Sequence, residues 1–165
     1  MPATLPVPIE FRLPDGWLPA KPNGLDDEAV AFAAVHPRPD AGFAANITID
    51  GRLLAEAETL AGVADESVER LRSVGDPELE AQRREVGSAD APALAQRVSL
   101  SAVVGGVRRD LVQSQVYLCL QDIVDPHKRA VIRLALTATE AQHDAVLSEF
   151  QEFVRTVRPD TGAGA

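Results

Sequence analysis

The sequence has few of the residues that crosslink a chain or bind metal ions. It contains a single cysteine, Cys119, which excludes a disulfide within the chain and a zinc site built on paired cysteines. The three histidines, His36, His127 and His143, are too far apart in the sequence to form the i,i+4 pair with which a helix holds a metal. We therefore expect no metal or other cofactor, and we interpret the histidines as turn or surface residues.

Long apolar runs are missing as well. The longest purely apolar stretch, residues 29–35, is far shorter than the roughly 20 residues that cross a bilayer, so we expect no membrane insertion. Residues 1–6 have neither the basic nor the apolar region of an export signal, which favours a cytoplasmic protein. The sequence also lacks the G-x-S-x-G, P-loop and G-x-G-x-x-G motifs, and we predict no catalytic and no cofactor-binding residues.

Positive charge is scarce in this sequence. It has 16 lysines and arginines against 25 aspartates and glutamates, which gives a net charge of −9 at pH 7. Such a surface repels phosphate backbones, which excludes nucleic acid as a general partner. A length of 165 residues corresponds to one domain. We predict an N-terminal extension over residues 1–8, a folded domain over residues 9–158 and a flexible tail over residues 159–165.

Two kinds of periodicity run through the sequence. Alternating apolar and polar residues, or short apolar runs between turn residues, predict strands. The expected strands span residues 9–13, 29–35, 43–54, 79–86, 94–104, 108–121 and 130–138. Apolar residues spaced by three and four positions predict two amphipathic helices, over residues 59–74 and about 140–157. The run 29–35 also fits a short helix, although the flanking prolines favour a strand.

The order of these elements predicts the fold class. Three strands, a helix, four strands and a second helix follow one another, and the Gly-Gly pair at 105–106 predicts a two-residue hairpin turn. Tight turns between consecutive strands make those strands antiparallel. A capping box begins the last helix, either at Thr137 with Glu140 or at Thr139 with Gln142. We predict an α+β domain, with a twisted, mostly antiparallel sheet of about seven strands and two main helices packed on it.

Two segments resemble a known family. The segment FRLPDGW at residues 11–17 resembles the F-x-x-P-x-G-W opening of the PsbP-like superfamily, and ANITI at residues 45–49 resembles its A-N-I/V strand. This superfamily includes the photosystem II protein PsbP, the Mog and DcrB families and the actinobacterial LpqN-type lipoproteins. The resemblance spans about residues 9–157. The arginine- and alanine-rich composition is most similar to the LpqN-type branch, whose signal peptide and lipobox cysteine this sequence does not contain. The resemblance implies a PsbP-like fold and a bias towards binding protein partners rather than catalysis.

Several single residues have two interpretations. Trp17, the only tryptophan, fits either a core plug that holds the first strand or an exposed anchor for a partner, and we favour the core. Cys119 lies in an alternating strand without a local base, which predicts a packed, unreactive thiol. Four arginines fit a small basic spot for a carboxylate or phosphate, but scattered surface charge is the favoured interpretation. These are Arg83, Arg84, Arg108 and Arg109.

The polar face of the long hairpin is almost without charge. It comprises Ser99, Ser101, Gln113, Gln115 and Tyr117. Exposed strands normally carry charges that prevent sheet-to-sheet association, so this face is either covered or meets a partner. Tyrosine gives a large contact area for little loss of side-chain entropy, which favours Tyr117 as an anchor. We predict a protein partner or a homodimer docked on these residues, because a self-complementary patch serves both subunits of a twofold dimer.

Two functions fit the sequence. The favoured one is a non-catalytic, protein-binding or chaperone-like module that uses a sheet face or edge. The alternative is a small-molecule carrier or enzyme with a pocket between the sheet and the helices. A deep pocket with convergent polar groups would favour this alternative.

Overall fold

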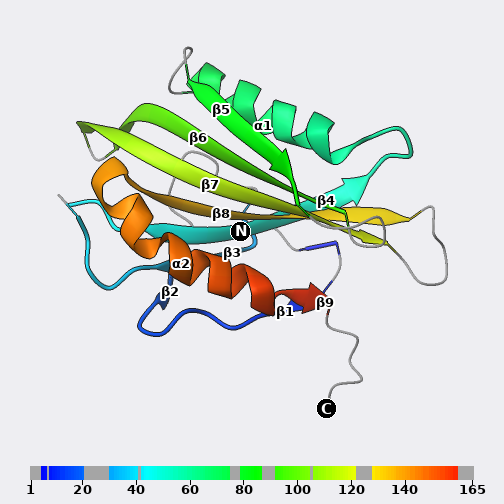
Figure 1. Cartoon of the computed structure of the whole chain (residues 1–165), viewed down its shortest axis with the longest axis horizontal. Coiled ribbons are helices and arrows are strands. Elements are labelled where there is room, and N and C mark those ends of the chain that lie inside the picture. The colour runs from blue at the N-terminus through cyan, green and yellow to red at the C-terminus, as the bar shows by residue number, and fades with distance from the viewer. Residues whose placement is uncertain are drawn as a thin grey trace.

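In the part of the chain that the structure describes, seven strands form the central sheet, and two helices pack on it (Figure 1). The computed structural model describes residues 5–6, 8–20, 30–40, 42–74, 79–86, 92–104, 106–121 and 128–159. In chain order the elements are β1 (Ile9–Glu10), β2 (Leu18–Ala20), β3 (Phe32–Val35), β4 (Asn46–Leu54), α1 (Leu60–Val74), β5 (Glu80–Glu85), β6 (Ala93–Val104), β7 (Val107–Gln121), β8 (Arg129–Thr139), α2 (Glu140–Thr156) and β9 (Arg158–Pro159). The sheet order is β2-β3-β4-β8-β7-β6-β5, with all neighbours antiparallel. The predicted α+β class is confirmed.

The two helices cover opposite faces of the sheet (Figure 1). Helix α2 packs on β8 and β7, and α1 packs on β6 and β7 from the other side. Strand β7 therefore sends apolar side chains to both faces, with Val116 and Leu118 towards α2 and Leu111 towards α1. A strand buried on both faces cannot have one inner and one outer side.

The α2 side of the sheet holds an apolar core. Phe150 and Phe153 of α2 pack on the isoleucines and leucines of β4 and β8. Trp17 closes this core at its margin, where it is 5% exposed and meets the ring of His36 edge-on at 5.2 Å between centroids. The interpretation of Trp17 as a core residue is confirmed.

The start of α2 follows directly from the end of β8. Thr139 is the N-cap, and its hydroxyl accepts a hydrogen bond from the backbone N–H of Gln142 at 3.2 Å. The structure thus selects the second of the two capping pairs that the sequence allows. The side chain of Gln142 does not complete the box, because it donates to the carbonyl of Arg38 instead.

The first predicted strand is wrong in extent and in partner. Only Ile9 and Glu10 are extended there, and they pair with β9 outside the main sheet. The seventh strand of the sheet is β2, which contains Pro19 and is not among the strands expected from the sequence. Strand β2 pairs only with β3, and proline is tolerated in such an edge strand because one side of the strand needs no backbone donor.

Strands β6 and β7 form the predicted hairpin. Val104 pairs with Val107, and Gly106 has a φ of +79°, which glycine adopts without strain. Gly105 lies outside the described residues. At the N-terminus, Leu5 packs against the α2-side core, although it belongs to the predicted extension.

Candidate functional site

The register of the hairpin divides the predicted docking residues between two faces. Ser99 pairs with Val112 and Ser101 pairs with Asp110, whereas Gln113 pairs with Val98. Directly paired residues point to the same side of a sheet. Ser99 and Ser101 therefore lie on the α2 side. The other predicted docking residues, Gln113, Gln115 and Tyr117, lie on the α1 side. The prediction that all five form one common surface is therefore wrong. The cause is that apolar side chains were assigned to a single inner face, whereas this sheet is covered on both.

Helix α1 covers the glutamines and the tyrosine. Gln115 and Tyr117 are 0% exposed. The Tyr117 hydroxyl is 2.8 Å from Oγ of Ser67 in α1 and 2.6 Å from Oε1 of Gln115, and burial raises the pKa of Tyr117. Gln113 is half-buried and donates to the hydroxyl of Thr137. Tyr117 and Gln115 therefore cannot anchor a partner while α1 is in place, which corrects the docking prediction for these two residues.

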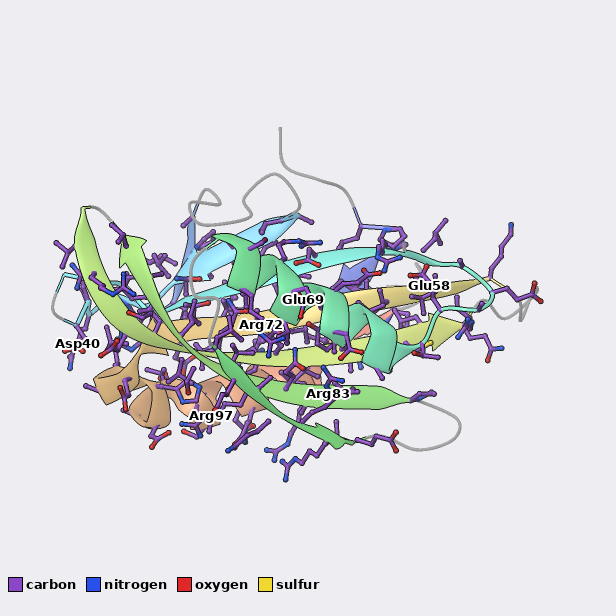
Figure 2. The ribbon with its side chains drawn as sticks, turned by 90° about the horizontal axis from the view of Figure 1, so that it is seen from above. Asp40, Glu58, Glu69, Arg72, Arg83 and Arg97 are labelled. Atoms are coloured by element: carbon purple, nitrogen blue, oxygen red, sulfur yellow. The ribbon has the colours of Figure 1, made fainter. Side chains whose placement is uncertain are left out.

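Amides beneath α1 bond to one another and to the helix. Gln96 donates from Nε2 to Oε1 of Gln115 at 2.8 Å and to the carbonyl of Ala64 in α1. Arg83 of β5, which is labelled in Figure 2, donates to Oε1 of Gln96 and forms an ion pair of 2.8 Å with Asp65 of α1. These polar groups satisfy one another under the helix. The charged side chain of Arg133 lies there too, where it donates to Ser67 of α1 and pairs with Asp50.

The opposite side of the sheet has an open groove. Helix α2 covers β8 and part of β7, and beside it lies a hollow of about 670 Å³ over β5, β6 and β7. Apolar side chains form its floor, among them Val116 of β7 and Leu147 and Val154 of α2, all half-buried. We call this hollow the α2 groove. Its lining is Gln82, Arg83, Arg84, Val86, Ala95, Gln96, Arg97, Ser114, Gln115, Val116, Leu147, Phe150, Gln151, Val154 and Arg155.

The charged residues around the α2 groove are arginines. Among the described residues, those that line it and carry a charge are Arg83, Arg84, Arg97 and Arg155. The side chain of Arg83 is engaged under α1, whereas Arg84 and Arg97 share the α2 side by register with Ala95 and Ser114. Three of these four arginines pair with carboxylates outside the lining: Arg83 with Asp65, Arg97 with Asp144 and Arg155 with Glu152.

A smaller hollow continues along β6. It has a volume of about 210 Å³ and is lined on the α2 side by Ser99, Ser101 and Asp110 and by Glu140 at the start of α2. Between the two hollows, Arg97 of β6 reaches Asp144 of α2 at 3.6 Å. Ser99 and Ser101 are thus the two predicted docking residues that lie at an open surface.

A half-buried serine contacts a buried histidine next to this ion pair. Oγ of Ser114 is 2.8 Å from Nε2 of His143, and Nδ1 of the ring is 3.3 Å from Asp144. His143 is 1% exposed, and the loss of hydration lowers its pKa. The interpretation of His143 as a surface residue is wrong, because it lies one helical turn before Val146 on the buried side of α2.

Serine, histidine and aspartate in this order also occur in acyl-transfer enzymes. Here the backbone amides of β7 around Ser114 bond to β6 and β8, so they do not form the free pair of donors that stabilises an oxyanion. The side chain of Asp144 is 81% exposed. The trio therefore fits a buried histidine whose ring nitrogens both have partners.

Comparison with known proteins identifies the fold. No family model matches the sequence, and no curated protein matches it. The solved structure of LpqN, described as involved in cell envelope biogenesis of Mycobacterium tuberculosis, aligns with a TM-score of 0.64 at 13% identity, over 93% of this chain and 85% of that one. The cyanobacterial PsbP of Synechocystis sp. PCC 6803 aligns with a TM-score of 0.53 at 15% identity, over 92% of this chain and 86% of that one. This chain has a PsbP-like fold.

The sequence had signals for part of the groove of this PsbP-like domain. Arg84 was a candidate for a basic spot, and the structure places it with Arg97 rather than with the hairpin arginines, Arg108 and Arg109. Leu147 and Val154 belonged to the apolar stripe of α2, and periodicity gave no sign that they are half-exposed. In the described ranges, no three histidine, cysteine or acidic side chains gather in a way that could hold a metal, and no helix is long and apolar enough to cross a membrane.

Proposed function

We propose that this PsbP-like domain is a non-catalytic module that binds a segment of a protein partner in the α2 groove. The observation that supports this is the combination of a half-exposed apolar floor with arginines around it. Covering apolar surface contributes about 25 cal/mol per Å², and arginine forms paired hydrogen bonds with carboxylates. The segment that fits this groove is acidic and apolar.

The arginines are available for exchange with such a segment. Arg97 pairs with Asp144 and Arg155 pairs with Glu152, and both carboxylates are largely exposed, at 81% and 74%. Exposed ion pairs of this kind contribute only about 0–1 kcal/mol. A partner carboxylate, partly dehydrated against the groove floor, replaces them at little cost.

Site-specific photo-crosslinking tests this proposal. A photoreactive residue replaces Gln151, which lines the groove, and in a matched variant it replaces Glu69, an exposed residue of α1 on the other side of the sheet. We expect the Gln151 position to crosslink a partner and the Glu69 position to crosslink none. The Gln151 crosslink should disappear in an Ala95→Glu background, which narrows the groove. Equal crosslinking at both positions would contradict the proposal.

The predicted homodimer is one of the outcomes of this experiment. A crosslinked product with twice the mass of the chain would identify a second copy as the occupant of the groove. Sedimentation of the wild type and of the Ala95→Glu variant then measures the dimer directly, and only the wild type should form it.

A small-molecule carrier is the second candidate function. The observation in its favour is the volume of about 670 Å³, which lies within the range of about 300–1,000 Å³ for ligand pockets. Native mass spectrometry of the purified protein tests it, because a bound molecule adds its mass to the wild type and not to the Ala95→Glu variant.

A further inference from the structure

The two hollows on the α2 side carry charges of opposite sign. Among the described residues, the charged lining of the α2 groove is all arginine, whereas that of the smaller hollow is Asp110 and Glu140. Both hollows lie along one strand, β6, which contributes Ala95 and Arg97 to the first and Ser99 and Ser101 to the second. The α2 side of β6 therefore forms a path with a basic end and an acidic end, which the Arg97–Asp144 ion pair crosses between the two hollows.

The spacing of the two ends suits an extended chain. The hollows are centred on β6 near residues 96 and 100, and four residues of strand span about 13 Å at about 3.3 Å per residue. A hollow of about 210 Å³ admits one side chain and not a helix, whose diameter is about 10 Å. An extended segment laid along β6 places every second side chain towards the path.

We propose that the site recognises an extended protein segment by its charge order: an acidic side chain at the basic end, apolar side chains on the floor, and a lysine or arginine at the acidic end. This inference rests on the proposed function, and it adds the chemistry and the orientation of the partner. The acidic side chain binds Arg84 and Arg97, and in doing so it replaces Asp144 as the partner of Arg97. The basic side chain binds Asp110 and Glu140, about four residues away.

The opposite orientation of the segment is disfavoured by repulsion. Turning the segment end for end would place its carboxylate against Asp110 and Glu140 and its cation against the arginines. Like charges at contact distance repel, and no other contact in either hollow offsets the free energy of this repulsion. The charge order of the segment therefore determines the specificity of binding more than its affinity. An acidic protein also attracts cations in general, which makes the basic end the selective element of the site.

Selection from a displayed library of short random peptides tests the inference on the intact protein. We expect the peptides enriched on the wild type to carry an acidic and a basic residue about four positions apart with apolar residues between them. Binding of one enriched peptide is then measured by fluorescence anisotropy. Arg84→Glu should weaken it about tenfold, which is about 1.4 kcal/mol, and changing the acidic residue of the peptide to lysine should restore it. Asp110→Lys should likewise weaken binding, and changing the basic residue of the peptide to glutamate should restore it.

Matched variants separate the inference from the proposed function. Arg70→Glu and Glu69→Lys change the net charge by the same amounts at exposed positions of α1, on the opposite side of the sheet from both hollows, and they should leave binding unchanged. Enriched peptides that bind but show no charge order, or no rescue by charge exchange, would overturn this inference alone. Peptides that bind the Val154→Asp variant as well as the wild type would overturn the groove as the binding site, and the proposed function with it. If that variant does not fold, as judged by a thermal melt, Ala95→Glu takes its place.

Discussion

At the scale of single residues, His143 shows how burial decides a side chain's chemistry. Loss of hydration lowers its pKa, the carboxylate of Asp144 acts in the opposite direction, and the nearby charge of Arg97 adds to the lowering. The neutral ring is kept inside the molecule by the hydroxyl of Ser114. The sequence suggested a surface position because histidine in the first turn of a helix is usually exposed. The ring is buried because Ser114 lies opposite it on β7, about thirty positions earlier in the chain.

The lowered pKa of His143 makes stability depend on pH. Above about pH 6.5 the imidazole is neutral in the folded and the unfolded chain, and it has no effect. As the pH falls below that value, the unfolded chain binds a proton that the folded chain does not yet bind, so the free energy of unfolding decreases. We expect this decrease in the wild type and not in His143→Asn. Urea unfolding at pH 7.5 and at pH 5.5 measures the difference. The same decrease in both proteins would contradict the buried, neutral ring.

Two of the predicted docking residues, Tyr117 and Ser99, differ sharply in burial. The stability of a variant at each position tests this difference. Tyr117→Phe removes a buried hydroxyl that contacts Ser67 and Gln115, and it should lower the free energy of unfolding by about 1–2 kcal/mol. Ser99→Ala is the matched change at an exposed position and should stay within about 0.5 kcal/mol of the wild type. Denaturant titration gives both values. A neutral Tyr117→Phe variant would mean that α1 does not cover Tyr117 in solution.

At the scale of elements, local patterns predicted what depends on local structure. The period of the apolar residues placed both helices to within one residue at each end, because one face of each helix is buried. The same reasoning placed β6, β7 and β8. It missed β2 because proline normally ends a strand, and only pairing with β3 at the edge of the sheet makes Pro19 acceptable. It also misassigned the hairpin faces. The predicted two-residue turn already pairs Ser99 with Val112, but apolar side chains were assigned to a single inner face, whereas this sheet is covered on both.

Helix α2 should depend on its two phenylalanines. Phe150 is 1% exposed and packs among the apolar residues of β8, so Phe150→Ala should lower the free energy of unfolding by about 3–5 kcal/mol. Gln151→Ala changes the next residue, which is exposed on the groove, and should have little effect on stability. Thermal or urea unfolding measures both. A small loss for Phe150→Ala would show that the apolar stripe of α2 faces solvent or a partner.

At the scale of the whole molecule, the groove exists because the sheet is wider than α2. Helix α2 lies on β8 and β7, and β6 and β5 extend beyond it with a side that is left open. No single segment of the sequence contains this information. The residues of the groove come from three strands and one helix, and Leu147 and Val154 belong to the apolar stripe of α2 that predicts ordinary core. Composition and periodicity predict the elements, whereas the width of a sheet relative to its helix emerges only in the assembled fold.

The two helices should also differ in the free energy that is needed to open them locally from the sheet. The residues of α2 that face the sheet, Val146, Phe150 and Phe153, are 1–3% exposed within one large apolar cluster. Those of α1, such as Val68 and Leu71, are 6–9% exposed, and the layer beneath α1 also contains amides and hydroxyls. Water that enters under α1 solvates these polar groups, which lowers the free energy of local opening there.

Hydrogen exchange followed by mass spectrometry tests this difference. Local opening exchanges the amides of the least stable element first, so peptides from residues 62–72 of α1 should take up deuterium before those from residues 144–154 of α2. Strands β7 and β8, which have a paired strand on each side, should exchange last and serve as the internal reference for global unfolding. A Gln96→Ala variant removes the amide that bonds to α1 at Ala64, and it should speed exchange in α1 while α2 is unchanged. Exchange in α1 as slow as in β8 would mean that the polar layer holds its helix as firmly as the apolar core does. The two sides of the sheet would then form one cooperative unit.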